Sequence, residues 1–183
     1  TILVLGCKDT ASTIALLRAA RAALGPMLSS FEVMWPSFFH YMSKATGLGS
    51  PLAGEHGTYV IIEATGFDDT YTRETLERFF ETAFEHGLVQ DGVLASSVKE
   101  ERALWAVRES PAEYETVLGP VIPFDVGIPI ARMEEAVTAI EAGIATLYPT
   151  ARALSYGHIG DSNLHVVVNV PEAGRDQPHG PVK

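Results

Sequence analysis

The sequence has little cysteine, few basic residues and no long hydrophobic run, and each deficit excludes a class of protein. Cys7 is the only cysteine among 183 residues, which excludes an internal disulfide framework and a CxxC metal cluster. Lys and Arg number 13 against 23 Asp and Glu, which argues against a nucleic-acid-binding protein, because such a protein needs a basic face. No apolar run reaches the roughly 18 residues of a membrane-spanning helix. These absences indicate an acidic, soluble domain from a reducing compartment.

Nucleotide-binding and serine-hydrolase motifs are also missing. No GxGxxG or GxxxxGK[ST] segment follows a predicted strand, so the usual site of a nucleotide-binding α/β protein is absent. Ser155 and Ser162 have no GxSxG context, which argues against a serine hydrolase.

Apolar residues along the chain alternate between strand spacing and helix spacing. The pattern predicts strands over 2–5, 31–34, 59–63, 92–95, 121–128, 154–157 and 164–170, and helices between Asp9 and Gly25, over 36–45, between Asp68 and Gly87, over 98–110 and over 130–147. This order predicts an α+β fold, a ferredoxin-like antiparallel sheet, single or duplicated, with helices packed on one face. A doubly wound parallel sheet is the alternative.

Proline and glycine indicate the limits of the domain. Pro123 lies within a predicted strand and favours an edge position or a bulge there. Residues 1–170 are expected to form one domain, and residues 171–183, with three prolines and two glycines, a mobile polar tail. Because the chain opens in a strand-like run at Thr1 and ends without a closing element, a fragment of a longer protein is expected.

Two histidines flank a predicted turn. Segment 157–163 holds two glycines and an Asp-Ser-Asn run, which predicts a tight turn between two strands. If those strands pair, His158 and His165 lie close together. Two imidazoles suit Zn²⁺ or another borderline divalent ion, although a catalytic site needs a third ligand and an open position. The alternative is that each histidine satisfies a backbone group at a hairpin corner.

Arg108 is a second candidate. It follows Leu104 by four residues and Trp105 by three, so it lies on or beside the apolar face of its helix. Its guanidinium either binds a substrate carboxylate in bidentate fashion, reaches solvent, or pairs with the helix end or a neighbouring Glu.

Glu32 and Cys7 are interpreted from their positions in or just after predicted strands, without a chemical role. Glu32 stands between Phe31 and Val33, so it occupies the opposite face of its strand, at solvent or at the rim of a site. Cys7 follows a buried strand and is interpreted as an inert core thiol.

Five segments, in order along the chain, resemble the C-terminal substrate (cap) domain of FAD-linked oxidases of the vanillyl-alcohol oxidase type. They are 31–34 (FEVM), 92–95 (GVLA), 104–109 (LWAVRE), 124–129 (FDVGIP) and 157–165 (GHIGDSNLH). The last is the specific one, because it follows the family's GH[LIV]GDGN[LIV]H at every position except Ser162. The branch it resembles holds D-lactate dehydrogenase, the flavin subunit of glycolate oxidase and D-2-hydroxyglutarate dehydrogenase.

The resemblance implies a set of site residues and cofactors. His158 and His165 are the implied ligands of a divalent metal such as zinc, Arg108 the group that binds the substrate carboxylate, and Asn163 a residue close to substrate and flavin. The implied FAD is bound mainly by an N-terminal domain absent from this chain. The implied function is the substrate-binding part of a flavin-dependent oxidoreductase that oxidises a small 2-hydroxy acid to the 2-oxo acid.

The sequence departs from the family's pattern at three points. Pro123 stands where members often have a Lys that holds a second carboxylate, which argues against a dicarboxylate substrate. Ser162 replaces a turn glycine. No SxEHG segment, the family's source of the third metal ligand and the catalytic His, follows His165. This chain alone is therefore expected to be inactive and to bind metal weakly.

The partners that these hypotheses imply are a 2-hydroxy acid, an FAD-binding domain, an electron acceptor (a quinone or an electron-transfer protein) and a second copy in a homodimer, with no nucleic acid. A cytoplasmic location, free or peripheral to the inner membrane, is expected. The alternative function is a free-standing ferredoxin-like module that binds a metal or small carboxylate without redox chemistry.

Overall fold

The computed structural model describes residues 1–45, 47, 49–109 and 118–169. The elements are β1 (Ile2–Cys7), α1 (Thr10–Leu24), η1 (Gly25–Met27), β2 (Leu28–Met34), α2 (Pro36–Ala45), β3 (Thr58–Ala64), α3 (Asp69–Glu85), β4 (Asp91–Leu94), α4 (Val98–Glu109), β5 (Val121–Gly127), η2 (Ile130–Arg132), α6 (Met133–Leu147), β6 (Arg152–Gly157), η3 (Ile159–Asp161) and β7 (Asn163–Asn169). Every predicted helix and strand is present. The predicted tail, 171–183, lies outside the described residues.

The strands form one sheet of seven in the order β4-β1-β3-β2-β6-β7-β5, and every pair is antiparallel. Strands β1 to β4 with α1 and α3 have the 4-1-3-2 order of a ferredoxin-like unit. Segment β5-α6-β6-β7 repeats its first three strands, in the order 5-7-6. The predicted fold class is confirmed, with a partial duplication, and the doubly wound alternative is wrong.

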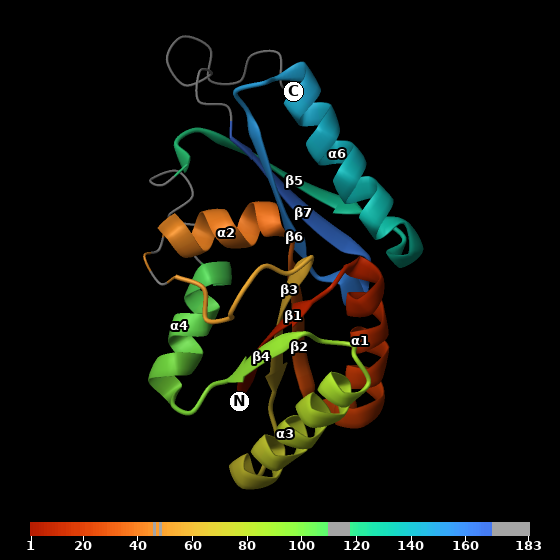
Figure 1. The fold of residues 1–183 in the computed structure, drawn as a ribbon, viewed down its shortest axis with the longest axis vertical. Helices are drawn as coiled ribbons and strands as arrows, with labels where there is room; N and C mark the ends of the chain where they lie inside the picture. Colours follow the sequence, from red (N-terminus) through yellow and green to blue (C-terminus); the bar gives the residue numbers. More distant parts are fainter. Residues whose placement is uncertain (46, 48, 110–117, 170–183) are drawn as a thin grey trace.

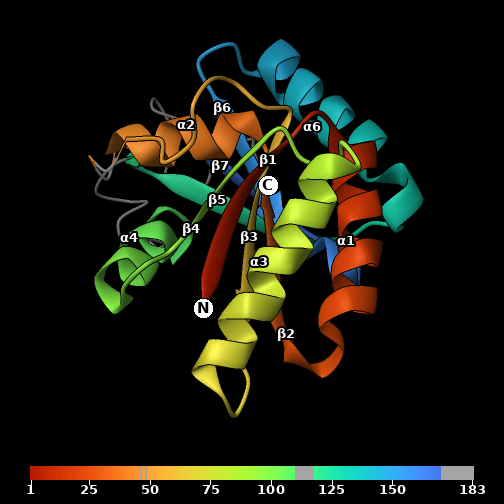
Figure 2. The same ribbon diagram turned by 60° about the horizontal axis from the view of Figure 1, so that its bottom comes forward.

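Helices cover both faces of the sheet (Figures 1 and 2). Helices α1, α3 and α6 pack on one face, in a core with Leu5, Val33 and Val60. Helices α2 and α4 pack on the other face, in a second core with Val4 and Ile61. The sequence prediction placed helices on one face and did not anticipate this second layer. The reason is that β1 is buried at every residue, and a strand that is apolar on both sides needs cover on both.

Local signals set the ends of the elements. The Asp9 carboxylate accepts the backbone N–H of Ser12 at 2.7 Å, and Asp68 accepts that of Tyr71 at 2.8 Å, so each aspartate caps the helix that follows it. Strand β5 is the last strand of the described sheet, which confirms the edge position that Pro123 indicated.

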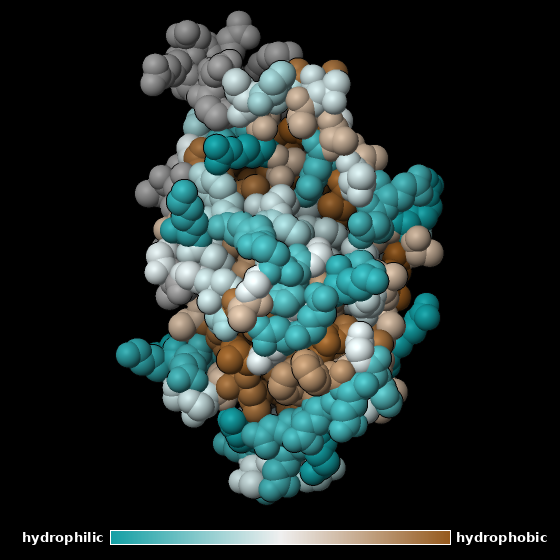
Figure 3. Space-filling view, in the orientation of Figure 1, coloured by the Kyte–Doolittle hydropathy of each residue, from teal (hydrophilic) through white to brown (hydrophobic). Residues whose placement is uncertain are grey.

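Much of the face seen in Figure 3 is hydrophilic, as expected for a chain with a formal net charge of −10. Within the described ranges, no helix combines the length and hydropathy that crossing a membrane requires.

Cys7 is buried, as predicted, and is expected to be unreactive in the folded protein. Burial raises the pKa of its thiol to about 11, although Thr13 and Thr58 partly oppose this by hydrogen bonding. We expect a thiol reagent at pH 8 to modify Cys7 only after unfolding in urea, and we expect stability to fall as the pH rises from 9 toward 11. Equal labelling rates with and without urea would contradict this.

Candidate functional site

A compact turn joins β6 to β7 and carries the GHIGDSNLH segment. Strand β6 ends at Gly157, a single 3-10 turn follows over Ile159–Asp161, and β7 begins at Asn163. Ser162 lies in the left-handed region at φ 59°, a conformation that favours glycine. This explains why a glycine suits that position in the family's pattern, and the predicted turn is confirmed.

The turn and the two strands bring His158 and His165 together. Their ring centroids lie 5.3 Å apart and the rings are nearly perpendicular. Nδ1 of His158 lies 2.5 Å from a Glu32 carboxylate oxygen, and Nδ1 of His165 lies 3.7 Å from an Asp125 oxygen. Each imidazole thus has a carboxylate on its Nδ1 side, and no described residue hydrogen-bonds either Nε2.

His165 is the more deeply placed of the two imidazoles, with a side chain 20% exposed against 42% for His158. Burial lowers its pKa, and the positive charges of Arg108 and His158 add to that effect, while Asp125 and Glu32 oppose it. Protonation of His165 is therefore disfavoured, and the neutral imidazole is the form that binds a metal.

Glu32 is the site residue that sequence reasoning interpreted least well. It lies on the strand face opposite Phe31 and Val33, as predicted, but its side chain is only 4% exposed. Its Oε2 accepts Nε of Arg108 at 2.8 Å, and its Oε1 faces His158. Of the two expected surroundings, solvent is wrong, whereas the rim of a site agrees with the structure, because Glu32 and His158 line the same pocket. The available signal was a charged residue within the apolar run of β2.

Arg108 does not pair with a neighbouring Glu of its own helix. It reaches from α4 to Glu32 on β2, and its guanidinium lies over the Tyr156 ring, 4.4 Å from the centroid. Its side chain is 12% exposed. No described residue hydrogen-bonds the two terminal Nη atoms, so they can bind a carboxylate.

Strand pairing explains how residues distant in sequence meet. Across four adjacent strands, Met34 of β2 pairs with Tyr156 of β6, Tyr156 with His165 of β7, and His165 with Asp125 of β5. Pairing of β2 with β6 covers only two positions, which leaves Glu32 just past its end, beside His158.

Asn163 starts β7, and its backbone N–H donates to the carbonyl of His158. Its side-chain oxygen is buried, and no described residue donates a hydrogen bond to it. A buried acceptor without a donor is uncommon in folded proteins and indicates a partner outside the described residues.

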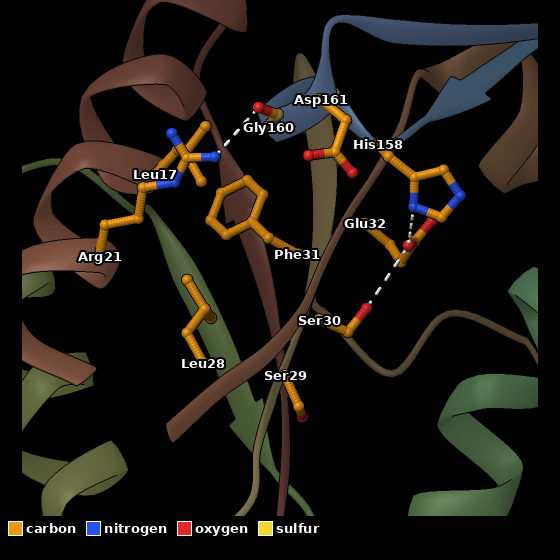
Figure 4. A pocket seen from close by; sticks show the side chains of 10 residues that line it. All are labelled: Leu17, Arg21, Leu28, Ser29, Ser30, Phe31, Glu32, His158, Gly160 and Asp161. Atoms are coloured by element: carbon orange, nitrogen blue, oxygen red, sulfur yellow. Dashed lines mark hydrogen bonds and ion pairs between the residues drawn. The ribbon is translucent and has the colours of Figure 1, made fainter. Parts of the chain in front are cut away.

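A pocket opens along the first half of β2, where β6 no longer pairs (Figure 4). At one side His158 and Glu32 point toward one another, and at the other Arg21 donates to the Gly160 carbonyl at 3.0 Å. Arg108 and His165 do not line it. The pocket gives a small molecule access to His158.

The metal hypothesis fits the described residues only in part. Within them, no cluster of three or more His, Cys, Asp or Glu side chains is arranged to hold an ion. His158 and His165 nonetheless have the donor pattern of metal-bound histidines, with Nε2 unengaged and a carboxylate near Nδ1. They could supply two ligands, and a third would have to come from elsewhere.

The fold and site define an α+β domain that gathers histidine, arginine and asparagine side chains near one turn. The sequence matches the family described as FAD linked oxidases, C-terminal domain, over residues 1–180, and the chain belongs to that family.

Its relatives include enzymes named for a hydroxy acid. The chain is 35% identical over 165 residues to the mitochondrial D-2-hydroxyglutarate dehydrogenase of Bos taurus, covering 90% of this chain and 30% of that protein. It is 32% identical over 169 residues to the Arabidopsis thaliana protein of the same name, covering 92% and 30%. The chain thus spans under a third of the length of these relatives.

Solved structures of alkyldihydroxyacetonephosphate synthase are similar in fold. One matches with a TM-score of 0.56 at 10% identity, over 92% of this chain and 36% of that one. At this identity the likeness concerns the fold alone.

Proposed function

We propose that this chain, as a domain over residues 1–170, is the substrate-binding part of an FAD-dependent oxidoreductase that oxidises a small 2-hydroxy acid to the 2-oxo acid. Membership of the FAD-linked oxidase family supports the redox class. The observation that carries the substrate class is the approach of Arg108 and His158 to the two oxygens of Glu32, beside His165.

Each residue of the site has a proposed role. The Nη atoms of Arg108, which no described residue hydrogen-bonds, bind the substrate carboxylate, because a guanidinium matches that group in charge and geometry. His158 and His165 contribute two ligands to a divalent metal such as zinc. The side-chain oxygen of Asn163, which has no donor among the described residues, accepts a hydrogen bond from the substrate hydroxyl or the flavin.

The chemistry that a bound FAD would supply is the acceptance of a hydride from C2 of the hydroxy acid. The chain itself orients the substrate and keeps C2 at a fixed position. No described residue is assigned as the base that takes the hydroxyl proton. We further propose that another domain binds most of the FAD, since no phosphate-binding glycine motif occurs in this sequence.

The electron acceptor, the homodimer and the cytoplasmic or inner-membrane location stay predictions. The relatives from Bos taurus and Arabidopsis thaliana are named as mitochondrial proteins.

The absorption spectrum tests whether this chain binds FAD without another domain. We expect the purified chain, mixed with FAD and desalted, to show no flavin band, because the proposal assigns most of the FAD site to another domain. A retained band would contradict this proposal.

The redox function is tested in the protein that joins this chain to an FAD-binding domain. We expect D-lactate, glycolate or D-2-hydroxyglutarate to bleach its flavin absorption without oxygen, and Pro123 leads us to expect a monocarboxylate to act best. Failure of all three acids would favour the module without redox chemistry.

A further inference from the structure

Glu32 contacts both Arg108 and His158, which have separate roles in the proposed function. Its Oε2 accepts Nε of Arg108 at 2.8 Å, and its Oε1 lies 2.5 Å from Nδ1 of His158. Ser30 donates a weaker hydrogen bond to Oε1 at 3.4 Å. The side chain is 4% exposed, and a buried carboxylate is costly unless such donors surround it.

We propose that Glu32 is the positioning residue of this site, and that its one carboxylate fixes both the tautomer of His158 and the direction of the Arg108 guanidinium. The roles of Arg108 and His158 rest on the proposed function. The contacts themselves belong to this chain and can be tested without substrate, metal or flavin.

The first half of this role concerns His158. An ionised carboxylate only accepts hydrogen bonds, so the Nδ1 atom facing Oε1 carries the proton. The lone pair of His158 then lies on Nε2, the atom that no described residue engages. A carboxylate behind a histidine ligand also fixes the ring direction and makes the free nitrogen a better donor to metal.

The second half concerns Arg108. Glu32 uses only the Nε donor, and the Tyr156 ring lies against the guanidinium 4.4 Å away. These two contacts hold the group from one edge and one face. No described residue engages the end that carries both Nη atoms, so that end can make a bidentate bond to a substrate carboxylate.

Glutamine at position 32 would disturb this arrangement in a defined way. Its side chain offers one carbonyl oxygen and one NH₂ group, whereas Arg108 and His158 both present donors. The glutamine in Glu32→Gln can therefore accept a hydrogen bond from only one of these two donors. Glu55→Gln is the matched control, because Glu55 pairs with His40 at 2.7 Å in an exposed position.

The test is the protonation pattern of the imidazole nitrogens, read by ¹⁵N NMR of the full chain. In the native sequence we expect the proton of neutral His158 on Nδ1. In Glu32→Gln we expect His158 to shift toward the Nε2–H tautomer. In Glu55→Gln we expect the tautomer of His158 to stay unchanged. A proton on Nε2 in the native sequence would overturn the proposal even if the variant failed to fold, and so would an unchanged tautomer in folded Glu32→Gln.

A Zn²⁺ titration of the same samples separates this inference from the proposed function. We expect Glu32→Gln to bind Zn²⁺ about 10–100-fold more weakly than the native chain, since the residues behind metal-bound histidines have effects of that size. Equal affinity would contradict the positioning role. If Zn²⁺ leaves both histidine signals of the native chain unchanged, the metal assignment fails, while the tautomer result still decides the role of Glu32.

Discussion

Replacing Arg108 by alanine is expected to lower the free energy of unfolding by about 3–5 kcal/mol. The variant leaves the Glu32 carboxylate, 4% exposed, without its guanidinium partner. It also removes the packing of that guanidinium on the Tyr156 ring. Removing one partner of a buried ion pair costs far more than the pair itself contributes, because the remaining charge stays desolvated.

Urea unfolding of Arg108→Ala beside Arg132→Ala measures this effect. Arg132 pairs with Glu135 at 2.7 Å, but both side chains are 67% exposed, so its loss should cost at most about 1 kcal/mol. Equal small losses in both variants would show that Glu32 does not depend on Arg108.

Arg108→Lys separates the binding role of Arg108 from its structural role. Lysine keeps the positive charge near Glu32 but lacks the planar fork that matches a carboxylate. In the protein that carries the flavin, we expect a raised KM for the 2-hydroxy acid and an unchanged flavin content. An unchanged KM would contradict the role given to Arg108.

Gly157→Ala is expected to cost about 3 kcal/mol, the upper end of the usual range for adding a methyl group to a packed site. An added Cβ would lie 2.5 Å from the backbone oxygen of Asn163 and 3.2 Å from Cα of Leu164. Both are backbone atoms, so β6 and β7 must separate at the turn. That movement displaces His158, and we expect the Nδ1–H signal of this histidine to be lost as well.

Gly127→Ala is the matched control for that variant. Gly127 pairs with Asn163 from the other side, on β5, and an added Cβ there meets nothing within 4 Å. We expect its unfolding free energy to change by less than about 1 kcal/mol, with a slight gain from reduced freedom of the unfolded chain. Similar losses of unfolding free energy in the two variants would show that steric crowding at Gly157 is not the cause of the destabilisation.

The site was predictable where it depends on adjacent residues. The glycines and the Asp-Ser-Asn run predicted the turn, and the turn brings the ring centroids of His158 and His165 to 5.3 Å from one another. Helical spacing placed Arg108 beside an apolar face, and its side chain is 12% exposed. The metal, substrate and flavin roles of these residues stay predictions, because no bound group is present to test them.

Glu32 was not predictable in the same way. Alternation along β2 assigns it to a face but does not say what covers that face. Its burial depends on α4, which supplies Arg108 from a position 76 residues later in the chain. A buried charge is stable only when ion-pair or hydrogen-bond partners lie beside it. The sequence around Glu32 does not specify which distant residues those partners are.

Apolar periodicity and motifs are local properties of a chain, and here they suffice to predict the order and type of the helices and strands, the ferredoxin-like class and the family. Three features depend on contacts between distant segments: two helices cover the second face, β2 meets β6, and Glu32 lies between Arg108 and His158. These features are not local, because the burial of the whole sheet selects which distant strands pair, and the position of the site follows from that pairing.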